Sequence, residues 1–184
     1  MLGFAVSVIT GPANSFVFLF AQNVLRQPGI VTASMVAGAG VAGLAGLLAG
    51  RWLADRAGRR LAGALSMVAV ALLAVVTYSG SVPALVVGYM LGVFAASVFA
   101  PAAGSLLNEL FPTTVRASAA GWSLAAGVLG AVAGLVAFGA VVGAGHSFAV
   151  AGLVTFLPAA LVMAAFWLLP ETRGREPEDL WPAR

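Results

Sequence analysis

Residues 61–108 read LAGALSMVAVALLAVVTYSGSVPALVVGYMLGVFAASVFAPAAGSLLN, and no side chain in this run carries a charge. A membrane-spanning helix needs about 20 consecutive apolar residues, so the run is long enough for two spans. Ser79-Gly80-Ser81-Val82-Pro83 interrupts it near its middle with residues that favour a turn. Because the apolar run is continuous rather than alternating, it predicts two membrane helices and not barrel strands.

The rest of the chain repeats this pattern. Further uncharged runs cover residues 2–25, 27–50 and 117–170, and Gly143-Ala144-Gly145-His146-Ser147 interrupts the last of them. The sequence therefore predicts an all-α membrane protein, a bundle of six transmembrane helices that occupies residues 1–170. We expect the helices at about 2–21, 30–50, 61–78, 83–107, 119–142 and 148–169, followed by a cytoplasmic tail at 171–184.

Composition excludes several classes of protein. Hydrophobic residues make up 61% of the chain and charged residues 8%, whereas a soluble domain is nearer 45–50% apolar and about 25% charged. An ordinary soluble enzyme and a nucleic-acid binder with a broad basic face are thereby excluded. The chain has no cysteine, no cluster of metal-ligand residues and no phosphate-binding glycine loop, so we expect no metal, no cofactor and no use of ATP.

The arginines predict the orientation in the membrane. With six spans, the connection that holds Arg51, Arg56, Arg59 and Arg60, the connection that holds Arg116, and the tail share one side. That side carries eight arginines, and the other carries only Arg26. The positive-inside rule places the eight in the cytoplasm, so we expect a multi-pass protein of the plasma (inner) membrane with both termini cytoplasmic. Frequent Ala, Gly and Arg without any Lys indicate a GC-rich, bacterial genome.

The predicted spans contain no Asp, Glu, Arg or His at mid-depth, so the chain by itself shows no proton path. Asn14 follows Gly11-Pro12, which frees backbone groups and favours a broken helix of the kind that lines transporter cavities. An equally open interpretation is that Asn14 forms a hydrogen bond across a helix interface. The candidate substrate-path residues are Asn14, Ser15, Gln22, Tyr89, Ser97 and Trp122.

Small residues recur at four-residue spacing in three of the predicted helices. Such stripes allow helix backbones to approach closely, so we expect these helices to pack against one another through them. The stripes are Gly38, Ala42, Gly46 and Gly50; Gly88, Gly92, Ala96 and Ala100; and Ala126, Gly130 and Gly134.

Three charged stretches lie where the predicted helices leave the membrane. They read GRWLADRAGRR at 50–60, NELFPTTVRA at 108–117 and LPETRGR at 169–175. In this order they resemble the G-x-L-x-D-R-x-G-R-[RK], E-[LI]-F-P-T-x-[VI]-R and P-E-T-[KR]-G segments of the major facilitator superfamily. The first match covers Leu53, Asp55, Arg56, Gly58, Arg59 and Arg60, whereas Arg51 stands where the family has glycine.

This resemblance implies a function. Members of the superfamily are carriers built of two six-helix halves, and the third segment follows the last helix in carriers of sugars and organic acids. It implies that the chain is the carboxy-terminal half of a symporter-like carrier, which transports a small polar solute by alternating access. The implied partners are the lipid bilayer, the solute, and a matching amino-terminal half or a second copy. The implied cytoplasmic gate consists of Asp55, Arg56, Gly58, Arg59, Glu109, Arg116, Glu171 and Arg173.

Three other classes of membrane protein compare with a carrier as follows. A non-transporting fragment that pairs with a partner half, or acts as a regulatory or structural subunit, remains an alternative. An intramembrane enzyme is not expected, because a rhomboid-type protease needs Gly-x-Ser-Gly and a histidine in a late helix, and the lone histidine, His146, falls in a predicted outer loop. A water channel needs Asn-Pro-Ala repeats, and the sequence has none.

Overall fold

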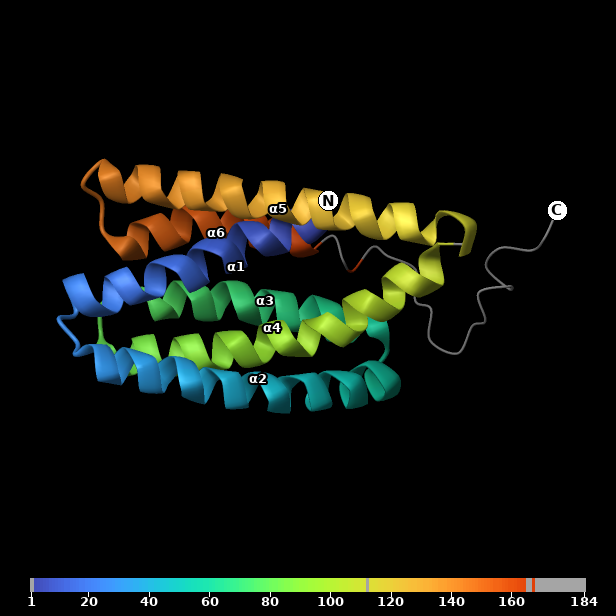
Figure 1. The fold of residues 1–184 in the computed structure, drawn as a ribbon, viewed down its shortest axis with the longest axis horizontal. Coiled ribbons are helices and arrows are strands. Elements are labelled where there is room, and N and C mark those ends of the chain that lie inside the picture. The colour runs from blue at the N-terminus through green and yellow to red at the C-terminus, as the bar shows by residue number, and fades with distance from the viewer. Residues whose placement is uncertain (1, 112, 165–166, 168–184) are drawn as a thin grey trace.

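The computed structural model describes residues 2–111, 113–164 and 167, and every regular element within them is a helix (Figure 1). The predicted all-α bundle is confirmed. In chain order the elements are α1 (Leu2–Leu19), the π-helix η1 (Phe20–Val24), α2 (Gly29–Ala57), α3 (Arg59–Thr77), α4 (Val82–Leu110), α5 (Thr113–Gly143) and α6 (Phe148–Ala164). The predicted tail at 171–184 lies outside the described residues.

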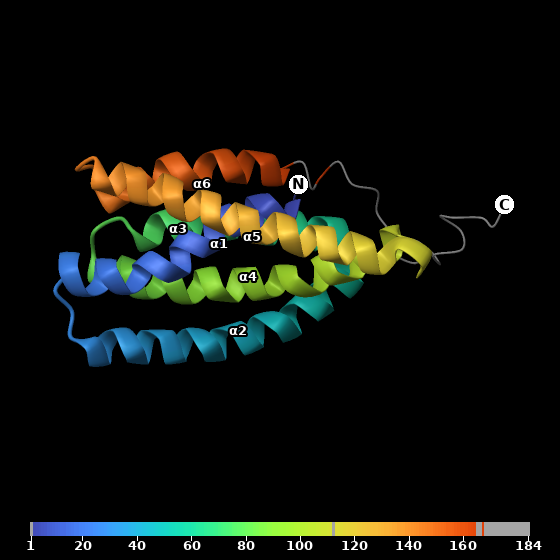
Figure 2. The same cartoon turned by 45° about the horizontal axis from the view of Figure 1, so that its top comes forward.

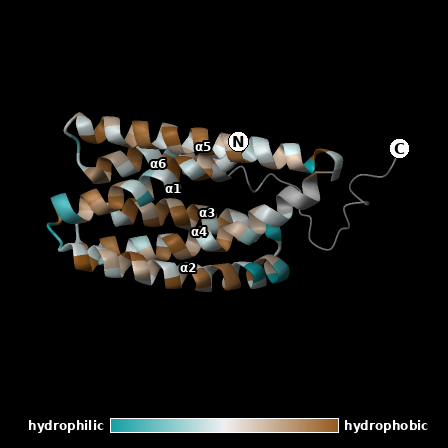
Figure 3. Ribbon diagram, in the orientation of Figure 1, coloured by the Kyte–Doolittle hydropathy of each residue, from teal (hydrophilic) through white to brown (hydrophobic). Residues whose placement is uncertain are grey.

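The helices run side by side, and the connections between them gather at the two ends of the bundle. Within the described residues, five helices are long and apolar enough to cross a membrane, and α6 contributes a shorter apolar helix. Hydrophilic residues collect at the ends, while the middle of the bundle is apolar or neutral (Figure 3). This distribution matches a bilayer with an apolar core about 30 Å thick and two polar surfaces.

The helix ends differ from the predicted ones at the charged motif. Residues 51–57 continue α2, so Gly58 alone separates α2 from α3. Gly58 has φ 97°, a conformation that side-chain-bearing residues rarely adopt, and this allows the sharp reversal. Likewise α5 begins at Thr113 rather than near 119. The predicted ends lie where the apolar runs stop, which marks the edge of the hydrocarbon layer. The helices α2 and α5 continue past that edge through residues with charged side chains.

Two helix pairs make the closest backbone contacts. Figures 1 and 2 show α2 alongside α4 and α1 alongside α5. A Cβ atom added to Gly46 of α2 would meet the carbonyl oxygen of Phe94, and one added to Gly130 of α5 would meet that of Phe4. Gly50 and Gly134 repeat these contacts one turn along, against Val98 and Val8.

The predicted stripes are therefore partly correct. Gly46, Gly50, Gly130 and Gly134 lie in close helix contacts, and Gly88 packs on α3 against Thr77. In the part of α2 that precedes Gly46, however, the buried residues of the last two turns are Ala39 and Gly43, rather than the predicted Gly38 and Ala42. A helix has 3.6 residues per turn, so a strict four-residue spacing drifts by about 40° at each step. Gly38 and Ala42 are therefore only partly buried, although Gly38 still lies against the Met90 side chain of α4.

Pro12 of α1 coincides with one of these contacts. Proline has no backbone N–H, so the carbonyl of Val8, four residues earlier, loses its helical donor. A Cβ atom on Gly134 would collide with the same carbonyl oxygen. The backbone of α5 thus packs directly against the freed acceptor.

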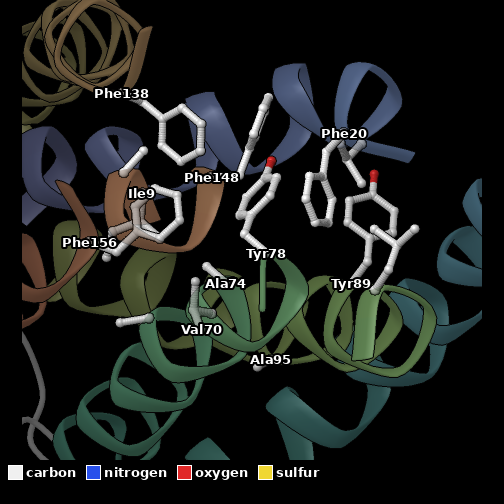
Figure 4. Close-up of a cluster of buried hydrophobic side chains, with 14 of the residues drawn as sticks. Ile9, Phe20, Val70, Ala74, Tyr78, Tyr89, Ala95, Phe138, Phe148 and Phe156 are labelled. Atoms are coloured by element: carbon white, nitrogen blue, oxygen red, sulfur yellow. The ribbon is translucent and has the colours of Figure 1, made fainter. Parts of the chain in front are cut away.

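An aromatic cluster joins four elements at the end of the bundle that holds the α3–α4 connection (Figure 4). Tyr78 follows α3, is 1% exposed, and lies with ring centroids 5.1–6.2 Å from Phe20, Phe138, Phe148 and Phe156. Its hydroxyl donates to the carbonyl oxygens of Pro12 (3.1 Å) and Ala13 (3.0 Å). The turn after α3 is therefore tied to the proline-containing part of α1.

We predict that Gly130→Ala destabilises the bundle by about 1–3 kcal/mol, because its methyl group would overlap a backbone oxygen that no side-chain rotation can move. Gly121→Ala, in the same helix, is the matched control, since nothing lies within 4 Å of its added methyl group. Thermal unfolding in detergent, followed by loss of the monodisperse peak, should show a lower midpoint for Gly130→Ala alone. Equal midpoints for the two variants would contradict this packing.

Candidate functional site

Asn14 of α1 and Tyr89 of α4 form a polar pair where these two helices meet. The Tyr89 hydroxyl, on α4, donates to Oδ1 of Asn14, on α1, at 3.2 Å. The Asn14 amide donates in turn to the Thr10 carbonyl oxygen at 2.9 Å. Asn14 lies twelve residues after the start of α1, about 18 Å along it, so the pair sits well within the apolar part of the bundle.

The two residues differ in exposure. Tyr89 is 9% exposed, whereas Asn14 is exposed at the bundle surface. Of the hydrogen-bonding capacity of Asn14, one amide hydrogen goes to Thr10 and one carbonyl lone pair goes to Tyr89. An amide has a second N–H and a second lone pair, and Asn14 is exposed, so it can offer both a donor and an acceptor.

A small hollow lies beside the pair, between α1, α3 and α4. Its volume is about 40 Å³, close to the space that one water needs. Its polar lining comes from Thr10, Asn14, Thr77 and Tyr89. Thr10 and Thr77 bond to carbonyls four residues earlier in their own helices, as threonine commonly does within helices. These two threonines were missed in the sequence because nothing there indicates which face of each helix they occupy.

The other predicted path residues lie apart from this pair. Ser15 is exposed on α1, and Gln22 is exposed on η1 at the end of the bundle. Ser97 lies in the contact between α4 and α2, with its hydroxyl 3.2 Å from where a Cβ atom on Gly43 would stand. Trp122 is 78% exposed on α5. The structure thus brings two of the six candidates together.

The charged motif occupies the end of α2 and the start of α3. Asp55 approaches Arg59 at 3.9 Å, and the Asp55 side chain is 71% exposed. An exposed pair at this distance contributes little to stability. The arrangement leaves most of the Asp55 carboxylate facing away from its own bundle.

Two arginines at this end stack on tryptophans. The Arg56 guanidinium lies 4.6 Å from the ring centroid of Trp52, and that of Arg60 lies 5.0 Å from Trp167. Cation–π contacts of this kind hold the guanidinium plane while leaving its N–H groups at the edge. Arg56 thus remains able to donate hydrogen bonds from the bundle surface.

Arg116, in the first turn of α5, forms hydrogen bonds with the end of α4. Its Nε and Nη2 donate to the carbonyl oxygen of Phe111, at 3.4 and 3.3 Å. Phe111 is the C-cap of α4, so the arginine satisfies a carbonyl that the helix end leaves open. Of the remaining gate candidates, the side chain of Glu109 and all of Glu171 and Arg173 lie outside the described part of the chain.

Comparison with known proteins fits this architecture. The family model of the Major Facilitator Superfamily matches residues 1–182, which include all three charged motifs. A search of curated proteins found no match. The family consists of transporters rather than enzymes, in agreement with a bundle of apolar, membrane-length helices. The chain therefore belongs to the Major Facilitator Superfamily and is an integral, multi-pass membrane protein of a family that transports small solutes across the bilayer.

Proposed function

We propose that this chain moves a small polar solute by alternating access, as the carboxy-terminal half of a two-bundle carrier. The hydrogen-bonded pair of Asn14 and Tyr89 is the observation that supports this best. Polar side chains at membrane depth are costly, and they are characteristic of substrate pathways. The pair joins α1 to α4 and leaves Asn14 exposed, so a second bundle packed over this face would enclose a polar site between the two halves.

The chemistry of Asn14 favours a neutral or weakly charged solute with hydroxyl groups. Its open donor and acceptor suit a hydroxyl, which both donates and accepts. Tyr89 and Thr10 fix the orientation of the amide, so the solute meets a preset pair of hydrogen-bonding groups. The P-E-T-R-G stretch at 170–174 supports the sugar and organic-acid class of carriers.

The partner in this proposal is a matching amino-terminal half or a second copy of the chain. Large apolar side chains remain exposed on α2 and α5, for example Leu44 and Leu129. Lipid covers such side chains in part, and a second bundle would cover others. The rocking of two bundles about a site near the midplane would then expose Asn14 first to one side of the membrane and then to the other.

Asn14→Ala should reduce solute uptake to near background in a carrier assembled by co-expression with an amino-terminal half. The substitution removes both groups offered to the solute while keeping the helix. Uptake would be measured with radiolabelled monosaccharides and small carboxylates. Asn23→Ala, which removes the same side chain at the end of the bundle, is the matched control and should transport normally. A chain that inserts but supports no uptake with any half would favour the non-transporting alternative.

A labelling experiment tests the position of Asn14 without knowledge of the solute. The chain has no cysteine, so Asn14→Cys introduces a single thiol. A membrane-impermeant maleimide should label it, because the reactive thiolate requires water. Val154→Cys, on the exposed apolar surface of α6, should remain unlabelled. Failure of Asn14→Cys to react from either side of the membrane would remove Asn14 from the solute path.

We further propose that both termini lie in the cytoplasm. Arg51, Arg56, Arg59 and Arg60 gather at the α2–α3 end, and Arg26 lies at the opposite end. Reporter fusions after Arg60 and after Arg184 should therefore report the cytoplasm, and a fusion within 143–147 should report the outside. A cytoplasmic signal from 143–147 would overturn this orientation.

Asp55 is proposed as a gate residue. Its exposed carboxylate, held by one weak ion pair, is available to a helix end or a cation of the opposite bundle. Such a contact would favour the closed inner gate by about 1–3 kcal/mol. Asp55→Asn should therefore leave expression and orientation unchanged, slow turnover, and shift the carrier toward the inward-open state.

Accessibility labelling from each side of the membrane would measure that shift. Asp179→Asn removes the same charge from the tail and should leave both labelling and turnover unchanged. If Asp55→Asn behaves like this control, the carboxylate has no gating role.

A further inference from the structure

A second hollow lies on the face of α4 opposite to Asn14 and Tyr89. It is an apolar groove of about 400 Å³ between α2 and α3, floored by α4. Its walls and floor include Trp52, Leu53, Leu65, Leu73, Leu91 and Val98. The polar side chain in its lining, Ser66, donates its hydroxyl to carbonyls of its own helix at 2.7 and 3.0 Å. Apart from the indole N–H of Trp52, the groove therefore offers a ligand an apolar surface.

The groove opens sideways, toward the surface that faces lipid. Leu65 on one wall and Leu91 on the floor are both about half exposed. Its lining on α3 runs from Leu65 to Leu73, about 12 Å along the helix. One leaflet contributes about 15 Å of hydrocarbon, so the groove spans most of the depth of a leaflet.

One end of the groove is cationic. Trp52 forms its wall at the α2–α3 end and carries the Arg56 guanidinium at 4.6 Å. Arg56 lies one turn beyond Trp52 and Leu53 on the same face of α2. Residues 50–60 contain four arginines and a single acid, Asp55. The site is thus an apolar channel that ends in positive charge.

We propose that this groove binds one acyl chain of an anionic phospholipid from the leaflet next to the α2–α3 turn, with the phosphate bound by Arg56. The apolar lining suits a hydrocarbon chain, whereas a polar solute would find few hydrogen-bonding groups there. The charge of Arg56 at the groove end distinguishes lipid from a second membrane helix, because an apolar helix would offer this guanidinium no anionic group. Arginine binds phosphate through paired N–H groups, and the ring of Trp52 leaves the edge of the Arg56 guanidinium accessible.

Fluorescence of Trp52 tests the proposal. Trp122, Trp167 and Trp181 are replaced by phenylalanine in the full chain, so that Trp52 alone emits, and the protein is reconstituted in phosphatidylcholine bilayers. Brominated phosphatidylglycerol should quench Trp52 at about fivefold lower mole fraction than brominated phosphatidylcholine, as expected for one arginine near an anionic surface. Equal quenching by the two lipids would overturn the proposal.

Three variants separate the headgroup from the chain. Arg56→Gln should remove the preference for phosphatidylglycerol, whereas Arg26→Gln, at the opposite end of the bundle, should retain it. Ala69→Phe fills the groove from α3 and should weaken quenching by both lipids several-fold. Ala49→Phe fills it from α2 and serves if the first filling variant does not fold.

Two results would refute the acyl-chain site. The first is unchanged quenching in both filling variants while they keep native helicity and monodispersity. The second is quenching that falls as the protein-to-lipid ratio rises, because a second copy of the chain would then cover the groove. Retention of the phosphatidylglycerol preference in Arg56→Gln would refute the headgroup assignment.

Discussion

Close approach between helix backbones is the constraint on which this bundle depends. Inside a bilayer, lipid chains are as apolar as leucine, so helices gain little from burying apolar surface and associate through tight packing. Here Gly46 and Gly50 of α2, and Gly130 and Gly134 of α5, stand against backbone carbonyls of α4 and α1, where a methyl group does not fit. Gly88 packs on α3 one residue before Tyr89, and Gly11 packs on α5 three residues before Asn14. The polar pair is therefore positioned by the same contacts that hold the helices together.

The two faces of α4 have different chemistry. One face carries Tyr89, whose hydroxyl donates to Asn14 of α1 at membrane depth. The other carries Leu91 and Val98 and lines a groove with apolar walls. Since the helix is rigid, a change in its tilt alters both sites at once. The proposed solute path and the proposed lipid groove are thus linked through a single element.

The fold could be predicted from the sequence because an uncharged apolar run longer than 20 residues is long enough to span the bilayer. Within lipid, a continuous apolar run of this kind satisfies its backbone hydrogen bonds as a helix. The extension of α2 through residues 51–57 could not be predicted in this way. Hydropathy places the end of the helix at the first charged residue, although charged residues can continue a helix. Asn14 and Tyr89 were recognisable as polar residues at depth, but their contact joins positions 75 apart and depends on the rotation of two helices. Tyr78 ends the helix predicted at 61–78, but the sequence does not indicate that its ring lies in the aromatic core or that carbonyls near Pro12 accept its hydroxyl.

The single-residue reversal at Gly58 has a mechanical consequence. The described connections at the opposite end, 25–28, 78–81 and 144–147, each have several residues, whereas α2 and α3 are joined without slack. Two rods hinged at one point cannot slide along each other, so a displacement of α2 along its axis is passed directly to α3. The helices α2 and α3 therefore move together at the arginine-rich end. The longer connections at the opposite end leave the helices there more freedom to move relative to one another.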